Sequence, residues 1–247
     1  GVMMQGAIGT QTGLKLHLNG VKLALWSDYT DWPLDKDMGE LLTGAVGELT
    51  DIGADLARAK PDVNPEEVLD VYLSLLIPIV MMDVPKAQLM SMAAFRPMMK
   101  FFQKFEKTPF TTRNWAIKAT QSHIDWMEVD GRRSAIKSKM REFFQSYDAL
   151  IMPVSPTPAF AHDTSGSVLS RKLKVNDENV PYASNLSWIA LATMCHLPVV
   201  TIPVGRTRDG LPVGIQIVGA QGEDARILDI AEACEGAFGG FRKPANL

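Results

Sequence analysis

Hydrophobic and polar positions divide the first part of the chain into a short strand and a long helical region. The apolar run at residues 22–26 ends in polar turn residues, which predicts a buried strand. Residues 35–60 carry apolar side chains three and four positions apart, the pattern of one face of an amphipathic helix. Residues 64–147 continue as several helices. Breaks in this block are expected near Pro85, Pro97 and Pro109.

Strand signals return in the last hundred residues. Residues 148–154 predict a strand that the proline-rich loop SPTPAFAHD terminates. Residues 172–182 predict a small hairpin, and residues 182–196 a helix. A closing helix is expected over residues 223–238.

The stretch LPVVTIPVGRTRDGLPVGIQIVG, residues 197–219, holds two apolar runs joined by a charged turn. The runs at 199–203 and 213–218 are continuous rather than alternating, as in strands that are covered on both faces. They predict a central hairpin of a covered sheet. The order of elements favours an α/β layer fold with a helical insertion at 64–147 over two independent domains.

Composition excludes several classes of protein. The 247 residues are 46% hydrophobic and 21% charged, with a net charge of -3, which is typical of a soluble globular protein. No basic surface is indicated, so nucleic acid is not expected as a partner. The longest apolar stretch, 71–82, is too short to span a membrane, which needs about 20 residues, so no membrane partner is expected. Cys195 and Cys234 form no CxxC motif, which favours a reducing, cytoplasmic setting.

Three segments resemble one enzyme family. The run WIALATMCHLPVVTIPVGRTRDGLPVGIQIVGAQGEDARILDIAEACEGAFGGF, residues 188–241, resembles the C-terminal segment of amidase signature enzymes, especially their bacterial branch. The stretches YDALIMPVSPTPAFAHD and VKLALWSDYTDWPLDKDMGELLTGAVGELTDIGADL are similar to the same family and occur in its order. GLPVG followed by QIVG is specific as a combination. His196 departs from the pattern, because the family usually has glycine there.

The resemblance implies a three-layer α/β/α fold around a mixed sheet, and hydrolysis of small-molecule amides by a Ser, cis-Ser, Lys triad without a cofactor. The Gly/Ser-rich signature resembling GGSSGGS, which carries the nucleophile in this family, is not found in the 247 residues. Residues 1–247 are therefore interpreted as the C-terminal portion of a single amidase domain, inactive alone and lacking its N-terminal half. A non-catalytic binding or assembly subunit remains the alternative, and a homo-oligomer would be one way to cover exposed strand edges.

Other catalytic sites find little support in the sequence. Ser134 and Lys137 form an SxxK pair, but the many basic neighbours favour a solvated helix face. The loop 165–170 contains serines and one glycine, and a plain surface loop is the better interpretation. Metal-ligand spacing is not found around the histidines, His17, His123, His162 and His196.

Substrate-pocket candidates come from two regions. Ser155, Pro156 and Thr157 lie on a loop after a strand, where α/β folds place ligands, and Tyr182 and Trp188 precede the next strand. Six of the 13 methionines fall between residues 81 and 99, and Met92 and Met98 are candidates for an adaptable acyl or aryl pocket within 64–147. Core packing is the alternative for both regions. Amidotransferase members of the resembled family have an acidic residue near the segment YASNL, which has none, so glutaminase activity is disfavoured.

Overall fold

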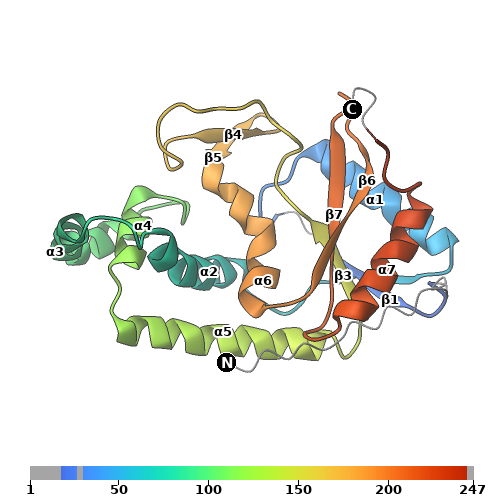
Figure 1. Ribbon diagram of the computed structural model, residues 1–247, viewed down its shortest axis with the longest axis horizontal. Helices are drawn as coiled ribbons and strands as arrows, with labels where there is room; N and C mark the ends of the chain where they lie inside the picture. The colour runs from blue at the N-terminus through green and yellow to red at the C-terminus, as the bar shows by residue number, and fades with distance from the viewer. Residues whose placement is uncertain (1–17, 27–29, 244–247) are drawn as a thin grey trace.

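The computed structural model describes residues 18–26 and 30–243, and a mixed sheet is its central element (Figure 1). The sheet has the order β2-β1-β3-β7-β6. β1 runs parallel to β2 and β3, whereas β7 is antiparallel to both β3 and β6. The strand bounds are β1 Lys22–Leu25, β2 Asp55–Arg58, β3 Ala149–Pro153, β6 Val199–Arg206 and β7 Pro212–Val218.

Helices cover both faces of the sheet, which confirms the three-layer α/β/α architecture. Helices α1 (Lys36–Asp51) and α7 (Asp224–Ala237) pack on one face. Helices α6 (Ser187–Cys195), α2 (Pro65–Val80) and α5 (His123–Phe143) lie on the other (Figure 1). None of the helices within 18–26 and 30–243 has the length and hydropathy to cross a bilayer.

Each face of the sheet has its own hydrophobic core because successive strand residues point to opposite sides. On β3, Leu150 and Met152 join the core beneath α2 and α6, while Ala149 and Ile151 join the core beneath α1 and α7. Ala24 on β1 joins the first of these cores. The chain thus buries both faces of the sheet with its own helices.

The predicted helix over 35–60 is wrong in its second half. Helix α1 ends at Asp51, and residues 55–58 form β2, the edge strand beside β1. Gly53 adopts a φ of +94°, a conformation that ends the helix and that side chains rarely tolerate. The short strand that follows has no apolar alternation long enough to reveal it.

The helical block 64–147 is confirmed, with one difference in its breaks. Helix α3 (Lys86–Gln103) begins after Pro85, and Pro109 lies between α3 and α4 (Thr112–Ala119), as predicted. Pro97, in contrast, lies inside α3. A single proline can remain within a long helix at the cost of one backbone hydrogen bond.

The hairpin over 172–182 is confirmed as β4 (Lys172–Val175) and β5 (Glu178–Pro181), which form a separate two-stranded sheet. The predicted helix over 182–196 is two elements, the 3-10 turn η1 (Tyr182–Leu186) and α6.

The paired strands β6 and β7 do not both lie inside the sheet. β7 is buried between β3 and β6, whereas β6 is an edge strand of the described sheet, and Val199 is 39% exposed. The prediction of a central hairpin is therefore wrong for β6. An apolar edge strand has the same sequence character as an interior one, so the pattern could not separate them.

Candidate functional site

A cluster of three tryptophans lies at the carboxyl ends of the parallel strands. Trp26 follows β1 directly, and its ring centroid is 5.2 Å from that of Trp32 and 6.1 Å from that of Trp188. The Trp188 indole Nε1 donates a hydrogen bond of 2.9 Å to the carbonyl oxygen of Pro33. All three side chains are buried, and Trp32 also lines a neighbouring cavity. The cluster is called the tryptophan floor below.

The loop after β3 holds its hydroxyl groups turned toward its own backbone. Ser155 Oγ donates to the carbonyl oxygen of Thr157 at 2.6 Å, and Thr157 Oγ1 donates to that of Pro158 at 2.9 Å. The backbone N–H of Asp35 donates to Pro156 O at 2.8 Å, which joins this loop to the start of α1. Neither hydroxyl is paired with a base among the described residues, so neither is arranged as a nucleophile. The role of this loop in a substrate pocket stays a prediction.

Gln216 ties the strand ends to the tryptophan cluster. This residue is buried on β7, and its Nε2 donates to Pro153 O at 2.6 Å and to Trp188 O at 2.9 Å. A buried side-chain amide that bridges two elements fixes their spacing. Through Pro153 at the end of β3, and through the Pro33–Asp35 segment, Trp188 and the loop 155–157 lie at the same edge of the sheet. Their role in a substrate pocket stays a prediction.

A cavity of about 480 Å³ lies between residues 30–36 and the β4–β5 hairpin. Its lining includes Asp31, Trp32, Lys36, Asn176 and Glu178. The Asn176 side chain crosses from the hairpin to this segment, because its Oδ1 accepts from Lys36 N at 2.9 Å and its Nδ2 donates to Leu34 O at 3.2 Å. The cavity wall is therefore held by the same hairpin that leads into η1.

Tyr182 lies at the start of η1 and contacts the loop after β3. Its ring is perpendicular to that of Phe160 at 5.8 Å, and the Arg171 guanidinium lies 5.9 Å from the ring centroid. Tyr182 is half-buried. Its role as a pocket residue stays a prediction.

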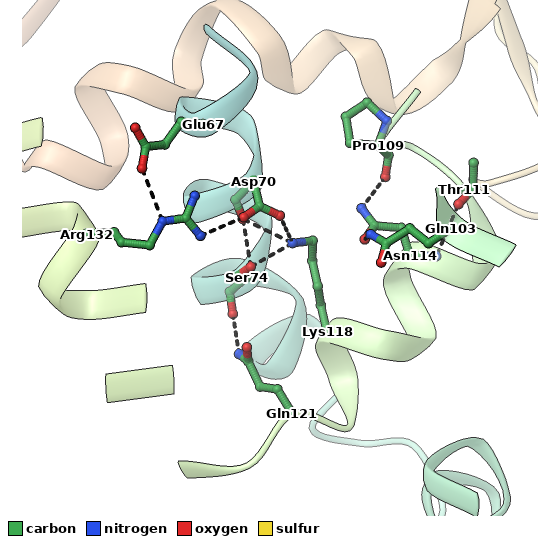
Figure 2. A network of polar contacts seen from close by, with 10 residues as sticks. All are labelled: Glu67, Asp70, Ser74, Gln103, Pro109, Thr111, Asn114, Lys118, Gln121 and Arg132. Carbon is green, nitrogen blue, oxygen red and sulfur yellow. Dashed lines mark hydrogen bonds and ion pairs between the residues drawn. The ribbon is translucent and has the colours of Figure 1, made fainter. Parts of the chain in front are cut away.

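A polar network that the sequence did not indicate lies within the helical block (Figure 2). Lys118 on α4 donates from Nζ to Asp70 Oδ1 at 2.5 Å, to Asp70 O at 3.1 Å and to Ser74 Oγ at 2.6 Å. Arg132 on α5 donates to Asp70 Oδ2 at 2.8 Å and to Glu67 Oε1 at 3.1 Å. The Lys118 side chain is only 6% exposed. The network joins α2, α4 and α5 in one set of ion pairs.

Burial and charge act in opposite directions in this network. Burial raises the pKa of the Asp70 carboxyl, but Lys118 and Arg132 overcome it and hold that pKa below its ordinary value. Burial lowers the pKa of Lys118, and the neighbouring Asp70 carboxylate only partly offsets that effect.

Ser74 and Lys118 resemble a serine–lysine catalytic pair only in distance. Ser74 Oγ donates its proton to Asp70 O at 2.7 Å and accepts from Lys118. A lysine acting as a base would instead accept the serine proton. All three lysine contacts are to acceptors, so the pair is arranged as a structural bridge. A polar cavity of about 270 Å³ adjoins it.

The methionine candidates lie far from the tryptophan cluster and the loop 155–157, which together are called the strand-end site. Met92 on α3 is half-buried and Met98 is exposed. Helix α3 lies at the end of the long axis opposite to α7 and the sheet (Figure 1). The structure does not bring these methionines to the loop 155–157, and their role in substrate selection stays a prediction.

The other sequence candidates have simple surroundings. Ser134 is exposed, and its Oγ donates to Asp130 O at 3.1 Å, the ordinary contact of a helical serine. Ser165 lies in an exposed loop, and its Oγ donates a hydrogen bond of 2.6 Å to Asp163 Oδ1. Across residues 18–26 and 30–243, His, Cys, Asp and Glu form no group that could hold a metal ion, and His17 lies outside these ranges.

Both cysteines are free and buried. Burial raises the pKa of the Cys195 thiol to about 12 and that of Cys234 also to about 12. Thiols in such surroundings are inert, so neither cysteine is a candidate nucleophile.

Comparison with known proteins identifies relatives across nearly the whole chain. The family model described as Amidase matches residues 6–228. A glutamyl-tRNA(Gln) amidotransferase subunit of Dehalococcoides mccartyi is 26% identical over 96% of this chain and 49% of its own length. The corresponding protein of Treponema denticola is 35% identical over 42% of this chain and 19% of its own length. The chain spans about half the length of the Dehalococcoides relative.

Solved structures share the fold. The crystal structure of a bacterial aryl acylamidase belonging to the amidase signature enzymes superposes with a TM-score of 0.63 and 18% identity. The match covers 90% of this chain and 44% of that one. The comparison of sequences and the comparison of folds therefore both identify amidases as relatives.

Proposed function

The chain belongs to the amidase signature family, and on that premise we propose that it forms the substrate-binding portion of an amide hydrolase. The reactive serine lies outside these 247 residues in this proposal. The observation that carries the proposal is the family match over residues 6–228 in a chain whose sequence lacks a GGSSGGS-like segment.

The proposed reaction is acyl transfer through a serine. The serine oxygen attacks the amide carbonyl carbon, the carbon–nitrogen bond breaks, and the amine leaves with a proton. Water then hydrolyses the resulting ester and restores the serine. No cofactor takes part. This chain would contribute the strand-end loop 155–157, the tryptophan floor and the cavity of about 480 Å³ beside it.

The surroundings of four described serines support a nucleophile from elsewhere. Ser74 and Ser155 both donate their protons to backbone carbonyl oxygens, and Ser134 does the same on the surface of α5. Ser187 Oγ is buried without a hydrogen-bond partner among the described residues, so it has no base beside it either. The two buried, unpaired cysteines favour a reducing, cytoplasmic setting.

A non-catalytic binding or assembly subunit is the second candidate. The observation that favours it is that the chain covers both faces of its sheet with its own helices and builds two separate cores. A polypeptide that buries its own hydrophobic cores can be stable as a separate subunit without carrying a catalytic triad.

The decisive experiment is an amidase assay on the purified chain, with an acyl anilide, a primary aliphatic amide and glutamine as substrates. We expect no turnover above background and no labelling by a serine-reactive fluorophosphonate. Turnover that Ser134→Ala or Ser74→Ala abolishes would overturn the proposal.

A second arm separates the two candidates. The chain is mixed with a separately produced polypeptide that carries the signature-bearing half of an amidase from the same gene or operon. Restored turnover supports the hydrolase, whereas binding without turnover supports the assembly subunit.

A further inference from the structure

Helix α3 presents its apolar side chains to solvent. The exposed large apolar residues of this helix and its C-terminal extension, here called the α3 face, are Met90, Phe95, Met98, Phe101, Phe102 and Phe105. No residue of α3 is buried. Exposed apolar side chains gathered on one element mark an interaction surface, whereas scattered ones do not.

The side of α3 that faces the protein carries both apolar and polar contacts. Its half-buried positions follow a spacing of three and four and are Leu89, Met92, Arg96, Met99 and Gln103. Arg96 pairs with Asp125 on α5 at 2.7 Å, and Gln103 Nε2 donates to Asn114 on α4 at 2.7 Å. This side holds the orientation of the helix, so the phenylalanines on the opposite side point outward.

The apolar face is bordered by positive charge. Lys86, Lys104 and Lys107 are exposed, and no ion pair is found for them among the described residues. Lys100 is also exposed, but it lines the polar cavity of about 270 Å³ together with Asp125 and Glu128. Lys104 Nζ lies 6.0 Å from the Phe101 ring centroid, which places a cation at the edge of the aromatic surface. Glu106 is the one acidic residue from 84 to 107, and it is occupied by Thr111 and Arg113.

We propose that α3 docks on an anionic membrane surface, with the α3 face in the acyl-chain boundary and Lys86, Lys104 and Lys107 at the lipid phosphates. Helices with phenylalanine and methionine on one side and lysine at the edge bind in the plane of the interface. Anionic lipid supplies the charge that the lysines lack. This mode needs no spanning segment. It therefore departs from the expectation of no membrane partner, which rested on the absence of such a segment.

A second copy of the chain fits this surface poorly. A two-fold contact would gather the lysines of both patches in one interface, and residues 84–107 offer one acidic residue, Glu106, to balance them. Helix α3 lies at one end of the long axis, away from the sheet (Figure 1), and the side chains of the α3 face are exposed.

The test is co-sedimentation of the chain with vesicles of phosphatidylcholine alone and of phosphatidylcholine mixed with phosphatidylglycerol. We expect binding to the mixed vesicles that weakens as salt rises. Phe105→Ser should weaken it about tenfold, since a buried phenylalanine is lost from the lipid. Lys104→Ala combined with Lys107→Ala should weaken it about 10- to 30-fold.

Matched controls come from equally exposed residues elsewhere. Phe241 is 75% exposed and Phe105 74%, so Phe241→Ser should leave binding unchanged. Lys172→Ala removes an exposed lysine of β4, so it is the control for the loss of positive charge and should leave binding unchanged. Equal binding to both vesicle types, or equal loss in a variant and its control, would overturn the proposal.

Two further measurements address other occupants. Sedimentation velocity without lipid would reveal a dimer that Phe105→Ser dissolves, and that result would overturn the proposal. In a longer polypeptide that contains this chain, amide exchange over 86–107 that is markedly slower than in the chain alone, without vesicles, would show that protein covers the face, and would also overturn it.

Discussion

Lys118 Nζ lies 2.5 Å from Asp70 Oδ1, although the lysine is on α4 and the aspartate is 48 residues earlier on α2. The lysine is almost fully buried, so the aspartate provides the negative charge without which it would be an isolated cation in the protein interior. The pair therefore determines whether α4 can pack against α2.

Asp70→Asn should destabilise the chain, because it leaves the buried Lys118 ammonium without its counter-charge. We expect a loss of about 2 kcal/mol in the free energy of unfolding, less than the about 3–5 kcal/mol of fully buried pairs. The reduction reflects the 42% exposure of the Asp70 side chain. Urea unfolding provides the measurement. Glu67→Gln is the control, since the Glu67 and Arg132 side chains are both 41% exposed, whereas Lys118 is 6% exposed. The Glu67–Arg132 pair should therefore contribute less than about 1 kcal/mol. Equal losses in the two variants would contradict the assignment.

Asp125 should make the stability of the chain depend on pH in the acid range. The backbone N–H of Ser122, followed by the Arg96 guanidinium, lowers the pKa of this carboxyl to about 2. The unfolded chain therefore binds the proton more readily, and the stabilisation is complete above the ordinary pKa of 3.8 and is lost as pH falls toward about 2.

The measurement is the free energy of unfolding at several pH values between the two pKa values. Asp125→Asn should flatten this dependence, whereas Asp209→Asn, on the exposed turn between β6 and β7, should leave it unchanged. An unchanged slope in Asp125→Asn would show that the capping contact with Ser122 does not form in solution.

Trp188→Phe should loosen the floor of the strand-end site. The change removes the hydrogen bond to Pro33 O and part of the packing against Trp26 and Trp32. We expect a loss of about 2–3 kcal/mol in unfolding free energy and a reduced near-ultraviolet circular dichroism signal. Trp115→Phe is the matched control, because Trp115 Nε1 has no hydrogen-bond partner among the described residues. A larger effect at Trp115 would contradict this account.

The strands that carry continuous apolar runs could be predicted, because burial on both faces leaves a local signature. Residues 22–26 and 148–154 contain β1 and β3 for this reason. The sequence did not predict β2, because a glycine turn joins this strand directly to α1 and its apolar residues continue the helical spacing. The edge position of β6 depends on which strands lie beside it, and no local pattern encodes that.

The candidate site could be predicted only where the order of elements along the chain indicates which residues follow a strand. The loop 155–157 follows a strand, and strand ends meet at one edge of a sheet. The contact between Asp70 and Lys118 joins residues 48 positions apart, and Lys118 lies within the segment WAIKAT with no partner nearby in sequence. Gln216 likewise gave no signal, because a polar residue within an apolar strand is equally compatible with exposure.

His196→Gly should stabilise the chain, although it removes a side chain. His196 ends α6 with a φ of 55°, the left-handed conformation in which glycine meets no steric penalty. Its side chain is exposed, so little packing is lost, and we expect a gain of about 1 kcal/mol in unfolding free energy. This geometry also explains why glycine is the usual residue here in the sequence pattern of the family.

Asn176 provides the matched comparison for this prediction. It has the same φ of 55°, but its side chain bonds Lys36 N and Leu34 O. Asn176→Gly relieves less strain, since asparagine tolerates this conformation, and it removes both contacts, so it should destabilise by about 1–2 kcal/mol. Thermal and urea unfolding of the two variants should therefore change in opposite directions. A loss of stability in His196→Gly would show that its side chain makes a contact outweighing the backbone strain.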